Sequence, residues 1–331
     1  MSSGNAGGSA QGHGDGSRKA ILAALLANLG IAVAKFVGFL ITHSSSLLAE
    51  AGHSLADTTN QGLLLLGRRQ AARTEDEHHN FGHGMARYFW SFIVGLILFT
   101  LGSLFAIFEG IEKIRRPRHI EKPGVAIVML AVAVLLEGFS FRTAIRESRL
   151  LKGTESWAAF IRTAKVPELP VLLLEDAGAL AGLAIALSGI VLSVVTGNPR
   201  FDGLATLSIG FLLGIIAVVL IVKMRSLLLG ESASPEEQER LRGALAGSPG
   251  VKRVINVRTM HLGPEELLVG AKLEFDASMS LAELANAIDV AEEQLRSAVP
   301  AARVVYLEPA IFDASRAAWI GDPTGGPLPG R

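Results

Sequence analysis

A chain of 331 residues, half of them apolar and 19% charged, is long enough for two domains and too apolar for a typical soluble protein. Its mean hydropathy is +0.41, and its apolar residues are gathered into runs instead of being spread evenly. The charges of the 31 basic and 31 acidic residues cancel, and no nucleic-acid partner is expected. Cysteine is absent, which excludes both a disulfide framework and a thiolate metal site.

The chain begins with a polar tail and continues into six apolar runs. Residues 1–17 are mostly Gly, Ser and Ala, and we expect a disordered tail there instead of a secretory signal. A transmembrane helix needs ~20 mostly apolar residues. Six candidate spans cover residues 20–41, 46–66, 88–111, 124–141, 169–195 and 203–222. The sequence therefore predicts an α-helical membrane protein whose six transmembrane helices occupy residues 18–230.

The basic residues of the connecting segments predict the orientation of these spans. An even number of spans places both termini on the same side of the membrane. Fourteen Lys and Arg residues lie in the segments on that side and six on the opposite side. Because basic loops stay in the cytoplasm, we expect cytoplasmic termini and a multi-pass location in the cell inner membrane.

The character of the sequence changes after the sixth span, and residues 231–313 read as a soluble domain. Apolar residues alternate over 267–275, the two-residue period of a strand with one buried face. Over 281–295 the apolar residues recur every three or four positions, as on one face of a helix. Ser280 and Glu283 form a capping box at the start of that helix.

Three further segments complete the predicted soluble domain. A helix is expected at 235–245, and strands are expected near 251–261 and 303–307. The resulting order, α-β-β-α-β, predicts a small ferredoxin-like α+β domain, which the orientation above makes cytoplasmic. Residues 314–331, rich in Gly and Pro, are expected to form a second disordered tail.

Ionisable residues inside the second and fifth spans are the candidate metal ligands. Each one costs at least ~2.5 kcal/mol at the bilayer centre, so it needs an explanation. Glu50, His53 and Asp57 are spaced three and four residues apart, which places them on one helix face. Glu175 and Asp176 lie in the first third of the fifth span. Zinc takes four ligands from groups of this kind, although hydrogen-bonded structural residues between helices would explain each one alone.

Other ionisable residues have weaker claims to a function. Glu109 and Glu137 lie near the ends of the third and fourth predicted spans, where snorkelling or helix pairing explains them as well as a proton path does. His78, His79 and His83 cluster in the segment before the third span. A solvated loop is the favoured interpretation of these histidines, and a second metal site is the alternative.

Several segments together resemble the cation diffusion facilitator family of metal/proton antiporters. The resemblance covers residues 18–313, and its most specific part is Ser-Ser-Leu-Leu-Ala-Glu-Ala-Gly-His-Ser-Leu-Ala-Asp at 45–57. Phe-Gly-His-Gly at 81–84 and Asp202 at the start of the sixth span add to it. The resemblance implies a homodimer with six spans per subunit, cytoplasmic termini and a ferredoxin-like cytoplasmic domain.

The transport site departs from the usual pattern of the family. That pattern joins a His-xxx-Asp or Asp-xxx-Asp pair in the second span to a similar pair in the fifth. His53 and Asp57 match the first pair, but Leu172 stands four residues before Asp176. The sequence resembles the branch with Glu-Asp in the fifth span, which implies Asp176 as the ligand and Glu175 as the substitute for the missing partner. Adjacent helical residues point ~100° apart, so both reach one ion only through a local distortion or a water molecule.

These residues lead to a functional hypothesis with three rivals. The chain is expected to be a secondary transporter that exports a divalent metal, with zinc first, through His53, Asp57, Asp176 and Glu175, using protons as the counter-ion. Its expected partners are the metal ion, membrane lipid and a second copy of the chain. The alternatives are a manganese, iron or cobalt transporter, a non-transporting membrane metal sensor or scaffold, and an intramembrane metallohydrolase. No enzyme is expected, because no span contains His-Glu-x-x-His.

Overall fold

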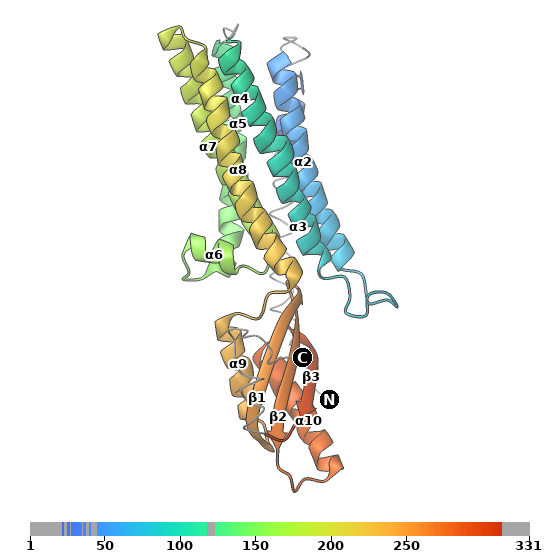
Figure 1. Ribbon diagram of the computed structural model, residues 1–331. Coiled ribbons are helices and arrows are strands. Elements are labelled where there is room, and N and C mark those ends of the chain that lie inside the picture. Colours follow the sequence, from blue (N-terminus) through green and yellow to red (C-terminus); the bar gives the residue numbers. More distant parts are fainter. Residues whose placement is uncertain are drawn as a thin grey trace, which may run out of the picture. The chain divides into compact units, whose positions relative to one another are not determined.

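The computed structural model describes residues 45–117 and 123–312, together with residues 22, 25–26, 28–34, 36–37 and 40 of the first predicted span (Figure 1). Of residues 45–54 and 56 only the backbone is described. The rest of the first span and both predicted tails lie outside the described residues. The described residues divide into a membrane domain, up to residue 73 and over 85–228, and a soluble domain, which takes in residues 74–84 and 229–312.

Long helices form the membrane domain and coincide with the predicted spans. They are α2 (Ser45–Ala71), the continuous stretch α3 (Ala86–Ile97), π-helix η1 (Leu98–Leu104) and α4 (Phe105–Arg115), then α5 (Pro123–Lys152), α7 (Glu168–Thr196) and α8 (Arg200–Leu229). Within the part of the chain that the structure describes, four stretches are long and apolar enough to cross a membrane: 86–115, 123–152, 168–196 and 200–229. A short helix between α5 and α7, α6 (Trp157–Thr163), was not predicted.

The helix that contains the fourth predicted span continues beyond it. The apolar run stops at residue 141, but α5 continues to Lys152. The last three turns contain Arg, Glu and Ser, which are compatible with a helix although they are too polar to be counted within a span. The longer helix places Glu137 near its middle instead of near its end.

Glycines let α4 and α8 pack closely. A Cβ at Gly110 would lie 2.6 Å from the backbone nitrogen of Leu207, and one at Gly210 would lie 2.7 Å from that of Ile107. Ser103 of η1 donates a hydrogen bond to the Gly210 carbonyl at 2.8 Å. Small residues at such a contact allow two membrane helices to approach until their backbones touch.

A buried ion pair joins α3 to the first turn of α7. Arg87 donates from Nε and Nη2 to the two carboxylate oxygens of Glu168, at 2.6 and 2.8 Å. Glu168 is 1% exposed, and the positive end of the α7 dipole adds to the stabilisation of its charge. The pair fixes the start of the helix that also contains Glu175 and Asp176.

The soluble domain has the predicted order α-β-β-α-β. Its elements are α9 (Pro235–Ala246), β1 (Val251–Gly263), β2 (Glu266–Phe275), α10 (Leu281–Ala298) and β3 (Ala302–Pro309). The central strand β2 pairs with β1 antiparallel and with β3 parallel, and α10 makes the crossover that parallel strands need (Figure 1). The predicted capping box of Ser280 and Glu283 is present.

One face of β2 provides the core of this domain. Every second residue from Leu267 to Phe275 is buried, as the alternation predicted. This face packs with Leu241 of α9 and Leu295 of α10 in one apolar cluster. Both helices therefore cover the same side of the sheet, which confirms the small α+β domain.

Candidate metal centre

The start of α7 buries two adjacent carboxyl groups inside the membrane domain. Glu175 is 7% exposed and Asp176 is 2% exposed. Leu172, one turn earlier, is completely buried and has no atom that could bind a metal. Because neighbouring helical residues point ~100° apart, the two carboxylates face different helices.

Glu175 faces α2, where two amide side chains bind it. Its Oε1 accepts a hydrogen bond from Asn60 Nδ2 at 2.9 Å, and its Oε2 accepts one from Gln61 Nε2 at 3.4 Å. The Gln61 carbonyl oxygen accepts in turn from Asn28 Nδ2, in the first predicted span, at 3.2 Å. Asn60 and Gln61 were not predicted as part of the site, although two adjacent amides in an apolar helix are a signal that could have found them.

Asp176 faces α5. Its Oδ2 accepts a hydrogen bond from Ser140 Oγ at 2.9 Å. Glu137 lies one turn before Ser140 on the same helix and is 9% exposed. The charges of Glu137 and Asp57 both act on Asp176, and those of Asp57, Asp176 and Glu137 act on Glu175. Asp57 and Glu137 thus lie near enough to interact electrostatically with the two carboxylates of α7.

The second span supplies the remaining predicted ligand. Residue 53 belongs to α2, one turn before Asp57, so the backbone places the two residues on the same face. The side chains of Glu50 and His53 lie outside the described residues. Their contribution to the site stays a prediction.

The described part of this cluster has the chemistry of a cation site. Carboxylates buried near one another repel strongly at low dielectric constant, and a divalent cation among them removes the repulsion. Carboxylate oxygens bind zinc at about 2.0–2.2 Å, and they also suit manganese and other divalent metals. Among the described side chains, no three of Asp57, Glu137, Glu175 and Asp176 have ligand atoms within 4.8 Å of one another, so these carboxylates from α2, α5 and α7 must move closer together to hold one ion.

From the sequence, Glu137 had only a weak claim to a function, because the predicted fourth span ended four residues after it. A carboxylate near the end of a helix can snorkel to the interface, whereas one in the middle of a longer helix cannot. Ser140 follows three residues later in the same apolar run, which puts both polar groups on one face. That spacing was the available signal.

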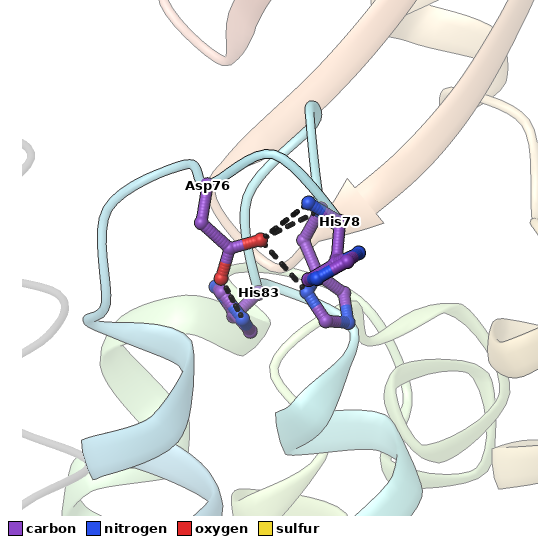
Figure 2. Close-up of polar contacts among 4 residues, drawn as sticks. Asp76, His78 and His83 are labelled. Atoms are coloured by element: carbon purple, nitrogen blue, oxygen red, sulfur yellow. Dashed lines mark hydrogen bonds and ion pairs between the residues drawn. The ribbon is translucent and has the colours of Figure 1, made fainter.

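A second group of metal-ligating side chains lies in the segment between α2 and α3. Ligand atoms of Asp76, His79 and His83 all lie within 4.8 Å of one another. Asp76 Oδ1 lies 3.1 Å from His79 Nδ1, and Asp76 Oδ2 lies 3.4 Å from His83 Nε2. In Figure 2 one oxygen of Asp76 is turned toward His83 and the other toward His78, whose backbone N–H donates to it at 2.9 Å. The sequence favoured a solvated loop here, and the structure gathers the side chains into one cluster.

Local hydrogen bonds prepare Asp76 for binding a cation. Burial acts to raise the pKa of the Asp76 carboxyl, but hydrogen bonds from the His79 ring and from the backbone N–H groups of His79 and His78 outweigh it and hold the pKa below its ordinary value. The carboxylate is therefore ionised at neutral pH. Gly84, just after the cluster, lies so close to the β1–β2 turn that a Cβ would be 2.7 Å from the Leu262 carbonyl oxygen. The loop thus packs on the soluble domain.

Comparison with protein families gives two matches that together cover most of the chain. Residues 21–229 match the cation efflux transmembrane domain. Residues 233–310 match the cytoplasmic domain of cation efflux proteins. The first match alone spans more than half of the 331 residues.

Individual relatives come from animals, plants and bacteria. The mitochondrial proton-coupled zinc antiporter SLC30A9 of Mus musculus is 34% identical over 264 residues, which are 79% of this chain and 46% of the relative. Metal tolerance protein C4 of Arabidopsis thaliana is 29% identical over 80% of this chain and 58% of the relative. The cation-efflux pump FieF of Escherichia coli is 26% identical over 87% of this chain and 91% of the relative. This chain spans about half the length of the animal relatives.

Proposed function

Since this chain belongs to the cation diffusion facilitator family, a family of multi-pass membrane transporters and not of enzymes, we propose that it exports a divalent transition metal, zinc first, in exchange for protons. The observation that supports this proposal is that Asp57, Glu175 and Asp176 lie near enough inside the membrane domain to interact electrostatically. A carboxylate buried in a membrane domain costs free energy unless a cation neutralises its charge.

The transported ion binds between α2 and α7. His53 supplies an imidazole nitrogen, and Asp57 and Asp176 supply carboxylate oxygens. Glu175 holds its place through Asn60 and Gln61 and adds negative charge next to the ion. Zinc accepts such a set of nitrogen and oxygen ligands without any thiolate.

Protons release the metal because both compete for the same lone pairs. The ion enters from the cytoplasm, the helices rock to open the site outward, and protons from the outer side replace the metal on the imidazole and carboxylates. The name of the mouse relative, a proton-coupled zinc antiporter, supports this exchange. A manganese, iron or cobalt substrate is the runner-up, because an oxygen-rich site discriminates weakly among divalent metals.

The assembly is a homodimer in the cell inner membrane with both termini in the cytoplasm. The match of residues 233–310 to the cytoplasmic domain of cation efflux proteins supports the cytoplasmic placement. The excess of basic residues on the side of the termini supports it independently.

A second metal position lies at Asp76, His79 and His83. The closeness of their ligand atoms supports it, together with the ionised state of Asp76. Two imidazoles and one carboxylate are three of the four ligands that zinc takes, with water as the fourth.

Metal flux into proteoliposomes tests the proposal. Zinc, manganese, iron and cobalt are offered in turn to vesicles containing the purified chain, with and without a proton gradient. We expect zinc flux to be largest and to fall when the releasing side is made alkaline. Zinc flux that is indifferent to the gradient would refute the exchange. His53→Asp should raise manganese flux relative to zinc, because it replaces the one nitrogen ligand with oxygen.

A further inference from the structure

We propose that Glu137 of α5 is a direct ligand of the transported metal, so that the site is held by three helices instead of two. The inference rests on the proposed function and extends its ligand set. It assigns a role to a residue outside the paired motifs of the second and fifth spans.

Helix α7 offers one metal ligand fewer than the usual pattern of a paired motif in the fifth span. Leu172 occupies the position where a second ligand would face the same ion, and its side chain is apolar and fully buried. Glu175 points toward α2, and each of its two oxygens accepts a hydrogen bond from an amide there. Each oxygen keeps a lone pair beside the hydrogen bond that it accepts, but the Glu175 side chain points about 100° away from that of Asp176. Asp176 is therefore the α7 residue best placed to bind, and the site needs a further oxygen.

The geometry of α5 provides that oxygen. Ser140 holds Asp176 by a hydrogen bond of 2.9 Å, which shows that this face of α5 meets the carboxylate. Glu137 is three residues earlier and on the same face of α5. Its side chain is buried, with an exposed fraction of 9%. Among the acidic side chains, Glu137 is the strongest electrostatic neighbour of Asp176, ahead of Asp57. Glu137 of α5 and Asp57 of α2 are thus both near enough to interact electrostatically with the Asp176 carboxylate.

The consequence is a complete tetrahedral set. His53 and Asp57 come from α2, Asp176 from α7 and Glu137 from α5, which makes one nitrogen and three oxygens. Zinc prefers four ligands, and removing a carboxylate from such a set weakens binding by at least about tenfold. A ligand on α5 also means that movement of α5 against α2 changes the affinity directly.

Equilibrium binding of Co²⁺ and Zn²⁺ to the purified full-length chain in detergent tests the role of Glu137. The parent for this experiment is the His79→Ala/His83→Ala variant, so that the loop cluster does not contribute. We expect Glu137→Gln to lower the affinity for both ions at least about tenfold and to change the visible Co²⁺ spectrum. Glu147→Gln is the matched control, because it makes the same change on the same helix ten residues away. It should leave affinity and spectrum as in the parent.

Each outcome decides a different point. If Glu137→Gln binds as the parent does while Asp176→Asn loses the metal, Glu137 is not a ligand and the proposed function stands. If Asp57→Asn and Asp176→Asn also bind as the parent does, the proposed function itself is wrong. Should Glu137→Gln fail to fold, Glu137→Asp decides, since a shortened ligand must alter the Co²⁺ spectrum. An unaltered spectrum would refute the inference.

Discussion

The two imidazoles and one carboxylate of His79, His83 and Asp76 form a proposed site whose metal can be measured separately from transport. His79→Ala/His83→Ala removes two of the three ligands, so the purified chain should bind one zinc ion fewer per subunit. Elemental analysis after gel filtration measures the ratio. His78→Ala is the control, because only the backbone N–H of His78 bonds to Asp76.

Zinc bound by this loop should also respond to pH. Protons compete with the metal for imidazole nitrogens, so occupancy should fall as the pH is lowered from about 7.5 to 5.5. If the His79→Ala/His83→Ala variant binds as much zinc as the unaltered chain, Asp76, His79 and His83 form only hydrogen bonds and hold no ion.

A buried ion pair fixes the register of α3 against α7 and gives a sharp stability test. Glu168→Ala removes the carboxylate that neutralises Arg87, and it should destabilise the membrane domain by about 3–5 kcal/mol. Thermal unfolding in detergent measures the loss. Glu112→Ala is the control, since its partner Arg116 is 78% exposed and such a pair contributes only about 0–1 kcal/mol. Equal melting temperatures for the two variants would contradict the structural role of Glu168.

At the scale of elements, the contact between α4 and α8 depends on glycine. Gly210→Ala places a Cβ 2.7 Å from the Ile107 backbone nitrogen, which cannot move away cheaply, so we expect a loss of about 1–3 kcal/mol. Gly138→Ala, on α5, has open space around it and should be neutral or stabilising by up to about 1 kcal/mol. The same detergent unfolding experiment compares them. A Gly210→Ala variant as stable as Gly138→Ala would show that α4 and α8 do not touch.

The helices and strands could be predicted closely, but their partners could not. Alternation over β2 and the capping box of α10 are local patterns, and both are present in the structure. Spans such as α7 and α8 are apolar on every side, so their sequence does not indicate which face meets which helix. For that reason charge alone predicted the candidate ligands on α2 and α7, and it gave no indication of Asn60 and Gln61.

Glu137 shows that the sequence also leaves the end of a helix undetermined. Apolar content marks where a helix lies in lipid, but it does not mark where the helix ends. The predicted end at residue 141 made Glu137 a terminal residue, and α5 in fact continues to Lys152. A polar pair three residues apart inside an apolar run, Glu137 with Ser140, is the pattern to look for in such helices.

At the scale of the whole molecule, the chain combines a helical membrane domain with a small α+β domain, as its composition predicted. Each has its own apolar core, one among the membrane helices and the other between β2 and its two helices. The membrane domain departs from a uniform apolar interior around Asp57, Glu137, Glu175 and Asp176, whose carboxyl groups lie near enough to interact electrostatically. That concentration of negative charge is the basis of the proposed transport.

Zinc uptake into proteoliposomes by the Asp176→Asn variant tests that basis most directly. The substitution keeps the size of the side chain and the capacity to accept from Ser140, but it removes the charge. We predict that uptake falls by at least about 10- to 100-fold, while Glu147→Gln, on α5 and outside the site, transports like the unaltered chain. Uptake by Asp176→Asn at the unaltered rate would contradict the account, because the metal would then cross without the buried carboxylate of α7.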